Sequence, residues 1–132
     1  MDDQDEKYPC KEETHALIGC AFEVLNELGH GLNEKLYENS LVVEFKRRAI
    51  AFDQQRHYEV LYKGEFVGEY IPDLIANGKV VVDAKTIDRI TDHERGQMLN
   101  YLRITQLAVG LIVNFKNARL EFERIALTNR KK

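Results

Sequence analysis

The sequence has only two cysteines and no long hydrophobic run, and both absences exclude classes of protein. Cys10 and Cys20 have no secretory context, so we expect reduced thiols rather than a disulfide framework. The sequence contains no CxxC or HxxxH pair of the kind that forms a zinc site. No apolar run approaches the roughly 18 residues of a membrane-spanning helix. The N-terminus, MDDQDEKYPC, lacks the basic and apolar regions of a signal peptide. A cytoplasmic protein that does not enter a membrane is therefore expected.

Several catalytic signatures are also missing. Ser40 is the only serine, and it lies inside a helical pattern rather than in a GxSxG turn. The sequence contains no GxxxxGK phosphate loop, and Gly29-His30-Gly31 follows a helical segment instead of a strand. The four histidines are scattered, without the spacing of a metal site or a nucleophile–base pair. These absences argue against serine hydrolases and nucleotide-binding loops.

There is no excess of positive charge. The chain has 19 Lys and Arg against 22 Asp and Glu, a net charge of −3. This argues against a nonspecific nucleic-acid coat. However, residues 1–13 contain six acidic and two basic side chains, so they contribute −4 and the remaining chain +1. The remaining chain is therefore basic enough to permit binding to a phosphate backbone, without requiring it.

The 132 residues are enough for one domain. We predict a single domain over residues 14–127, after an acidic lead-in at 1–13 and before a basic tail at 128–132. Thr14 is the expected N-cap of a first helix that ends at Gly29 or Gly31. Apolar residues at helical spacing predict two more helices, one whose apolar positions begin at Leu36 and which runs to about Arg48, and one from about Thr91 to Ile104.

The remaining segments have the patterns of strands. Residues 57–62 and 65–71 surround a Lys63-Gly64 turn, and Val80-Val81-Val82 follows an Asn77-Gly78 turn. Residues 108–113 form a continuous apolar run typical of a strand buried on both faces, and a last strand is expected within 120–127. The order is helix, helix, three strands, helix, strand, strand. It predicts a mixed α/β domain with helices packed on a central sheet.

Charged residues at the end of the Val80-Val81-Val82 run are the first candidate for chemistry. Asp83 and Lys85 are two apart on a strand and therefore point to the same face. Such charges reduce stability unless they are paired or hold an ion.

Asp73 precedes the turn, so the length of the turn decides whether Asp73 lies on the same face as Asp83 and Lys85. A two-residue loop would place Asp73 opposite residue 82, on the other face from Asp83. A three-residue loop over residues 76–78 would place it opposite residue 81, on the same face as Asp83. We predict a register that brings the two acids together.

Two helical segments add polar pairs. Glu34 and Tyr37 are three residues apart, and Gln97 and Tyr101 are four apart, so each pair shares one face of its helix. Each has an ordinary alternative, because Glu34 suits the first turn of a helix and the other side chains suit half-exposed helix positions.

Together these segments resemble the GxxExxY proteins, a group within the PD-(D/E)XK nuclease-like superfamily. The resemblance covers roughly residues 14–127. It implies a restriction-endonuclease-like core, helix–three strands–helix–strand, with an extra N-terminal helix and a final strand. Many members have Glu where Asp83 stands. The four matching motifs, in chain order, are Gly31-x-x-Glu34-x-x-Tyr37, Pro72-Asp73 with Asp83-Ala84-Lys85, Gln97-x-x-x-Tyr101-Leu102, and Gly110-Leu111-Ile112-Val113-Asn114-Phe115.

The resemblance implies a magnesium-dependent nuclease that hydrolyses phosphodiester bonds of DNA or RNA. Asp73, Asp83 and the backbone carbonyl of Ala84 would bind Mg²⁺ or Mn²⁺. Lys85 would orient the attacking water or stabilise the developing negative charge. Glu34 would be an outer or second-metal carboxylate.

The resemblance also gives roles to the helical residues. Gln97 and Tyr101 would position Lys85 or a phosphate, and Tyr37 would support the site. A second copy of so small a domain would be needed to cut both strands of a duplex, which favours a homodimer. Two other interpretations stay open: a non-catalytic module that binds nucleic acid or a protein, and an inherited fold in which Lys85 only forms a salt bridge.

Overall fold

The computed structural model describes residues 8–127. Its centre is a five-stranded sheet in the order β1-β4-β5-β6-β7. The strand β5 pairs antiparallel with β4 and parallel with β6, and the edge strands β1 and β7 pair antiparallel with their neighbours. The predicted basic tail and most of the acidic lead-in lie outside the described residues. The five strands are β1 (Phe52–Gln54), β4 (Leu74–Ala76), β5 (Val80–Lys85), β6 (Val109–Asn114) and β7 (Glu121–Ala126).

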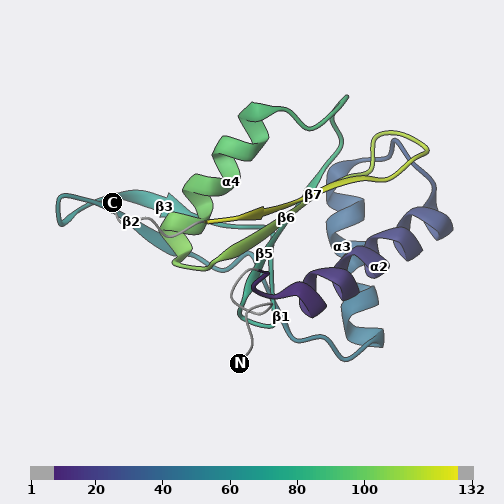
Figure 1. Ribbon diagram of the computed structural model, residues 1–132, viewed down its shortest axis with the longest axis horizontal. Helices are drawn as coiled ribbons and strands as arrows, with labels where there is room; N and C mark the ends of the chain where they lie inside the picture. The colour runs from purple at the N-terminus through teal and green to yellow at the C-terminus, as the bar shows by residue number, and fades with distance from the viewer. Residues whose placement is uncertain (1–7, 128–132) are drawn as a thin grey trace.

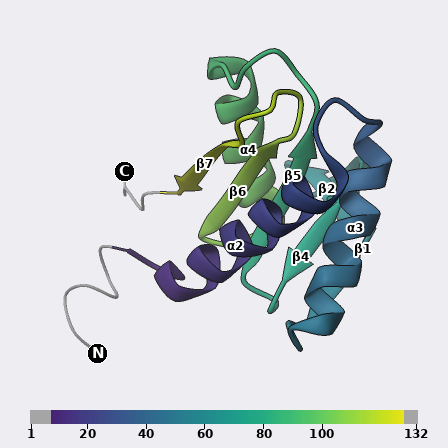
Figure 2. The same cartoon turned by 90° about the vertical axis from the view of Figure 1, so that its right-hand side faces the viewer.

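Helices cover both faces of this sheet. The helices α2 (Lys11–Leu28) and α3 (Glu34–Arg47) lie on one side, and α4 (Asp92–Thr105), which links the parallel strands β5 and β6, lies on the other (Figures 1 and 2). This is the mixed α/β architecture that the sequence predicts. No helix in the described part of the chain is both long and apolar enough to cross a membrane.

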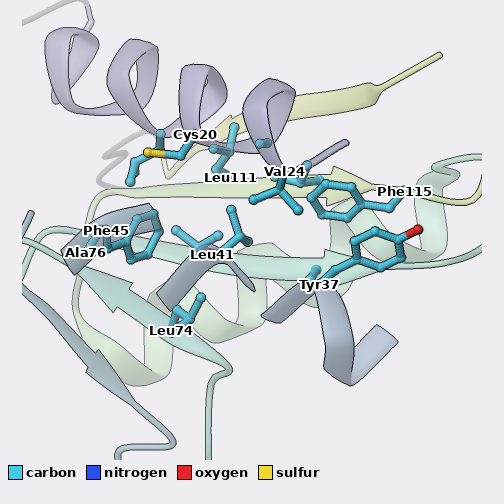
Figure 3. Close-up of a cluster of buried hydrophobic side chains, with 14 of the residues drawn as sticks. Cys20, Val24, Tyr37, Leu41, Phe45, Leu74, Ala76, Leu111 and Phe115 are labelled. Carbon is cyan, nitrogen blue, oxygen red and sulfur yellow. The ribbon is translucent and has the colours of Figure 1, made fainter. Parts of the chain in front are cut away.

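The core has one layer on each side of the sheet because consecutive strand residues point in opposite directions. Val80 and Val82 face α2 and α3, in the larger layer shown in Figure 3. Val81 faces α4, where Met98 and Leu102 cover it. Burial on both faces explains the uninterrupted valine run.

Two helix starts show how local hydrogen bonds set element boundaries. Thr91 is the N-cap of α4, and a reciprocal capping box joins it to Glu94. The prediction that Thr14 caps the first helix is wrong, because α2 begins at Lys11. Thr14 instead lies inside the helix, where its hydroxyl donates to the carbonyl oxygen of the N-cap residue Cys10 at 3.0 Å. The helix α3 begins at Glu34 after the N-cap Asn33, so Glu34 lies in the first turn as expected.

The predicted strands at 57–62 and 65–71 form, but they are not part of the main sheet. They are β2 (Tyr58–Tyr62) and β3 (Glu65–Tyr70), a separate two-stranded hairpin that projects beyond the sheet (Figure 1). Most of their side chains are exposed, so these strands lack the apolar faces that a central position requires. The strand β1 was not expected, because three residues with one apolar side chain give no strand pattern.

Candidate active site

The turn between β4 and β5 brings two carboxylates together. Leu74 pairs with Val82 and Ala76 with Val80, so the same register places Asp73 opposite Asp83. The turn residues are 77–79, and the Lys79 N–H donates to the Ala76 carbonyl oxygen at 2.9 Å. The expected partner of Asp73, residue 81, is therefore wrong by two positions. Because a two-residue shift preserves the face, the prediction that the acids share one face is confirmed.

Lys85 lies beside this pair on the same strand face. Its Nζ is 3.4 Å from Oδ2 of Asp83, and the two side chains are only 21% and 15% exposed. These residues alternate with Val82 and Ala84, which are buried toward α2 and α3, so the charged side chains lie on the α4 side of the sheet. The predicted common face of Asp83 and Lys85 is confirmed.

Backbone contacts fix Asp73. Its Oδ2 accepts a hydrogen bond from the Ala84 N–H at 3.4 Å, and its carbonyl oxygen accepts one from the Gln55 N–H at 3.1 Å. Pro72 before it is buried. The carboxylate is thus held against β5 beside Asp83.

Burial is the main cause of the raised pKa values of the two acids. Burial raises the pKa of Asp83 to about 7; Lys85 opposes this rise and the neighbouring Asp73 adds to it. Burial also raises the pKa of Asp73, and Glu38 raises it further. Burial lowers the pKa of Lys85, but Asp83 and Glu34 outweigh it and the net pKa is raised, so Lys85 is a cation at neutral pH.

Glu34 and Tyr37 have different positions, although they are three residues apart on α3. The side chain of Glu34 is exposed, and partial burial of its carboxylate raises its pKa, while Lys85 lowers it and Asp73 raises it. Glu34 therefore lies near enough to interact with the site. Tyr37 is fully buried; its hydroxyl donates to the Gly29 carbonyl oxygen at 2.7 Å.

The ring of Tyr37 is connected to the end of β5 through Phe115. It stacks on Phe115 with ring centroids 4.3 Å apart. The Phe115 N–H in turn donates to the Lys85 carbonyl oxygen at 2.9 Å. Tyr37 thus holds the chain that follows β6 against the end of β5.

Glu38 is a part of the site that the sequence analysis missed. It is 3% exposed, and its carboxylate accepts hydrogen bonds from Lys35 at 3.2 Å and from Gln54 and Gln55 at 2.9 Å each. Since the Gln55 N–H also contacts Asp73, Glu38 is linked to the acid pair by one residue. A glutamate one residue after Tyr37, on the buried side of α3, was the available signal.

The aromatic residues reach the site from α4 and the hairpin. Tyr101 stacks on Tyr70 with ring centroids 4.0 Å apart and an angle of 16° between the planes. Burial and the charge of Asp83 raise the pKa of both phenols, so both remain protonated. Gln97 is half-buried one turn before Tyr101 on the same helix. Tyr70 is a second residue that the sequence analysis did not place in the site.

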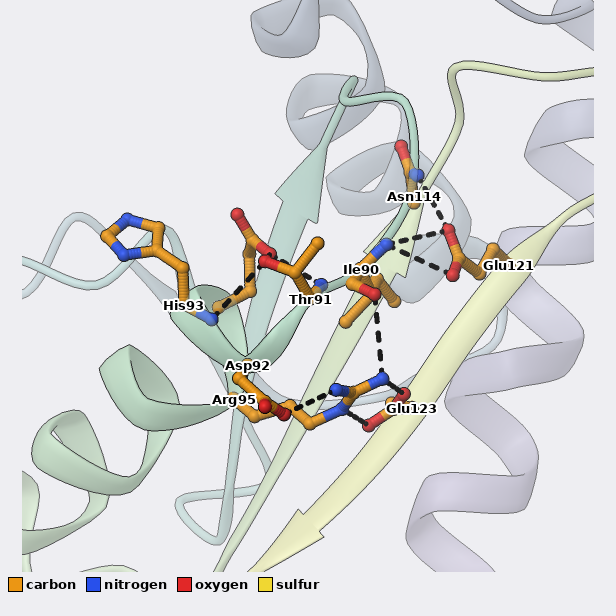
Figure 4. Close-up of polar contacts among 9 residues, drawn as sticks. Ile90, Thr91, Asp92, His93, Arg95, Asn114, Glu121 and Glu123 are labelled. Atoms are coloured by element: carbon orange, nitrogen blue, oxygen red, sulfur yellow. Dashed lines mark hydrogen bonds and ion pairs between the residues drawn. The ribbon is translucent and has the colours of Figure 1, made fainter.

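A polar network fixes the segment that follows Lys85 in the chain. Asn114 bonds both backbone groups of Ile87, at 3.0 and 2.8 Å. Glu121 accepts the Ile90 N–H at 3.1 Å (Figure 4). Arg95 on α4 forms a two-bond contact with Glu123 on β7, at 2.7 Å each. These contacts hold the start of α4, and so Gln97 and Tyr101, relative to the sheet.

The donor set at the acid pair fits a hard divalent cation. Two carboxylates with raised pKa values carry negative charge that such an ion would offset, and carboxylate and carbonyl oxygens suit Mg²⁺ or Mn²⁺. Within residues 8–127, no group of three or more His, Cys, Asp or Glu side chains is arranged to hold a metal ion. Glu34 is thus not brought together with Asp73 and Asp83 into one ligand cluster. An ion here would have two protein carboxylates, leaving room for water and substrate.

Comparison with known proteins identifies the fold and the family of the chain. The crystal structure of SSO0001 is similar in fold, with a TM-score of 0.57 and 16% sequence identity. The similarity covers 92% of this chain, which spans 58% of the length of that protein. No curated protein matches the chain closely enough to show a relationship. A family model described as the PD-(D/E)XK nuclease superfamily matches residues 11–125. The five-stranded mixed sheet with helices on both faces is accordingly a restriction-endonuclease-like fold, and the chain belongs to the PD-(D/E)XK nuclease superfamily.

Proposed function

We propose that the protein is a metal-dependent nuclease that hydrolyses phosphodiester bonds of DNA or RNA. The observation that carries the proposal is the position of Asp73 opposite Asp83, with Lys85 beside them on the same face of the sheet. The Gly31, Glu34 and Tyr37 spacing further supports placing the chain in the GxxExxY group.

Each residue of the site has a task in this reaction. Asp73, Asp83 and the Ala84 carbonyl would hold Mg²⁺ or Mn²⁺, which when bound polarises a phosphate oxygen and lowers the pKa of water. Asp83 holds the Lys85 ammonium at 3.4 Å, where its charge can stabilise a phosphate that gains negative charge. Because the pKa of Lys85 is raised, this charge persists through neutral pH. Glu34 and Tyr101 lie near enough to Lys85 to raise its pKa. Together with Gln97, one turn before Tyr101 on α4, they would orient Lys85 or a phosphate oxygen.

The expected partner is a nucleic acid. Lys85 and the exposed Arg56 and Lys116 are cations on a chain whose net charge, without residues 1–13, is +1. A domain this small would need a second copy to cut both strands of a duplex, so we expect a homodimer.

Purified protein is expected to cut labelled DNA or RNA when Mg²⁺ or Mn²⁺ is present. Single-stranded and double-stranded forms of each are incubated with either metal and with EDTA, and the products are separated on a denaturing gel. We expect cleavage with metal and none with EDTA.

The control for this assay is Asp73→Asn, purified in parallel, because it keeps the shape of the side chain and removes its charge. Cleavage that is equal in wild type and Asp73→Asn would come from a contaminating nuclease and would contradict the proposal. Metal-dependent binding of a nucleic acid without cleavage of any of the four substrates would instead support the non-catalytic binding module.

A further inference from the structure

A row of aromatic rings leads away from the acid pair onto the hairpin. Tyr101 stacks on Tyr70, and Tyr70 is directly opposite Tyr58 in the β2–β3 pairing. The Arg56 guanidinium lies over the Tyr58 ring, 5.3 Å from its centroid. We call these four side chains the aromatic row. Three tyrosines thus connect α4 to the hairpin and end at an exposed cation.

The row begins at the candidate active site. Burial raises the pKa of the Tyr70 phenol, and Asp83, Tyr101 and Asp73 raise it further, so the phenol is within electrostatic range of both carboxylates. Tyr70 is also only three residues before Asp73 in the chain. A nucleic-acid strand with a phosphate at Lys85 would therefore place its neighbouring nucleotides along the aromatic row.

The far end of the row is open to solvent. The side chain of Arg56 is 58% exposed and its contact with Asp53 is 3.6 Å long, between two exposed groups. Tyr58, Tyr70 and Tyr101 are each half-buried, so each retains some accessible surface. An exposed cation next to accessible aromatic rings is the combination that binds single-stranded nucleic acid: the rings stack on bases and the cation contacts the phosphate backbone.

We infer that the aromatic row binds the unpaired bases next to the cleaved phosphate, so the preferred substrate is a single strand or the single-stranded part of a longer nucleic acid. This inference rests on the proposed nuclease function for the position of the phosphate. It selects a substrate because bases paired inside a duplex have no free face for a tyrosine ring. DNA and RNA share this chemistry, and parallel probes distinguish them.

The test measures binding without cleavage. Fluorescence anisotropy in EDTA gives Kd for short labelled DNA and RNA strands, and for duplexes of the same sequence. The wild type is compared with Tyr58→Leu, Tyr58→Phe and Arg56→Gln. The matched control is Tyr62→Leu, because Tyr62 lies on the same strand, is 62% exposed and also has a cation, Lys63, 5.3 Å from its ring centroid, but lies outside the row.

We expect Tyr58→Leu to weaken single-strand binding about tenfold and Tyr58→Phe about twofold or less, since stacking needs the ring and not the hydroxyl. Arg56→Gln should weaken it about threefold and reduce the slope of log affinity against log salt by about one. Tyr62→Leu should leave Kd unchanged, and the wild type should bind single strands more tightly than duplexes.

Two results would overturn the inference: single-strand Kd values unchanged in both Tyr58→Leu and Arg56→Gln, or equal wild-type affinity for single strands and duplexes. Arg56→Gln keeps the test decisive if Tyr58→Leu unfolds, because an exposed side chain tolerates this change. Cleavage by the wild type separates the two proposals. Row-dependent binding without cleavage in Mg²⁺ would refute the nuclease function alone, whereas cleavage without row-dependent binding would refute the aromatic row alone.

Discussion

Lys85→Met is expected to reduce metal-dependent cleavage by about 10²- to 10³-fold, the cost typical of removing one preorganised group that stabilises charge in a transition state. Methionine keeps an unbranched stem of similar length but lacks the ammonium that Asp83 holds at 3.4 Å. The measurement is the initial rate of cleavage of the best substrate at saturating Mg²⁺. Metal affinity should change little, because Lys85 is not an expected ligand.

The matched control for this prediction is Lys79→Met. Lys79 lies in the turn between β4 and β5, where its side chain is 58% exposed and pairs with Glu13 at 3.3 Å. Removing this charge should leave the cleavage rate within about twofold, because it is distant from the acid pair. Equal losses in both variants would mean that general attraction to the nucleic acid, and not a positioned ammonium, explains the role of Lys85.

Asp83→Asn is expected to stabilise the metal-free protein at pH 8 while abolishing cleavage. The folded pKa of Asp83 is about 7, above the ordinary value of 3.8, so the folded state binds the proton more tightly than the unfolded state does. Stability is then greatest below about pH 4 and falls as the pH rises toward 7. A shift of about three units corresponds to about 4 kcal/mol at most, and we expect a gain of roughly 2–4 kcal/mol at pH 8.

Urea unfolding at pH 5 and pH 8 in EDTA measures this effect. The wild type should be less stable at pH 8 than at pH 5, and Asp83→Asn should show a smaller difference. Asp88→Asn is the control, because the Asp88 side chain is 97% exposed and its removal should change neither value appreciably. An Asp83→Asn protein less stable than wild type at pH 8 would show that Asp83 is retained for its ion pair with Lys85 rather than for a ligand.

Such a gain would show that the protein keeps an unfavourable charge for its chemistry. Asp73 and Asp83 face each other across one strand pair, and Lys85 offsets only part of their charge. A structural ion pair of the kind considered from the sequence would remove the excess rather than retain it. The stability cost at Asp83 therefore separates a functional site from an inherited salt bridge.

The acid pair was predictable because it depends on parity. Asp73 and Asp83 lie on one face whenever the numbers of two opposed residues, such as Leu74 and Val82, add to an even total. An error of two residues in the turn keeps the total even and therefore did not change the face. The valine run likewise identified β5, since burial on both faces leaves no alternation. These signals lie within the segments that they describe.

The missed features depend on contacts distant in sequence. Glu38 is satisfied by Gln54 and Gln55, 16 and 17 residues later, and no local pattern connects them. The role of Tyr70 depends on Tyr101, 31 residues later on α4. The main-sheet position expected for β2 and β3 failed because strand propensity does not specify which strands pair.

The most direct test of the proposed metal site is to locate a bound ion. Crystals of the wild type soaked in MnCl₂ should give an anomalous scattering peak between the carboxylates of Asp73 and Asp83, and Asp83→Asn crystals treated in the same way should give none. A wild-type peak elsewhere, or no peak, with crystals that remain well ordered, would contradict the assignment of these two aspartates as the metal site of a nuclease.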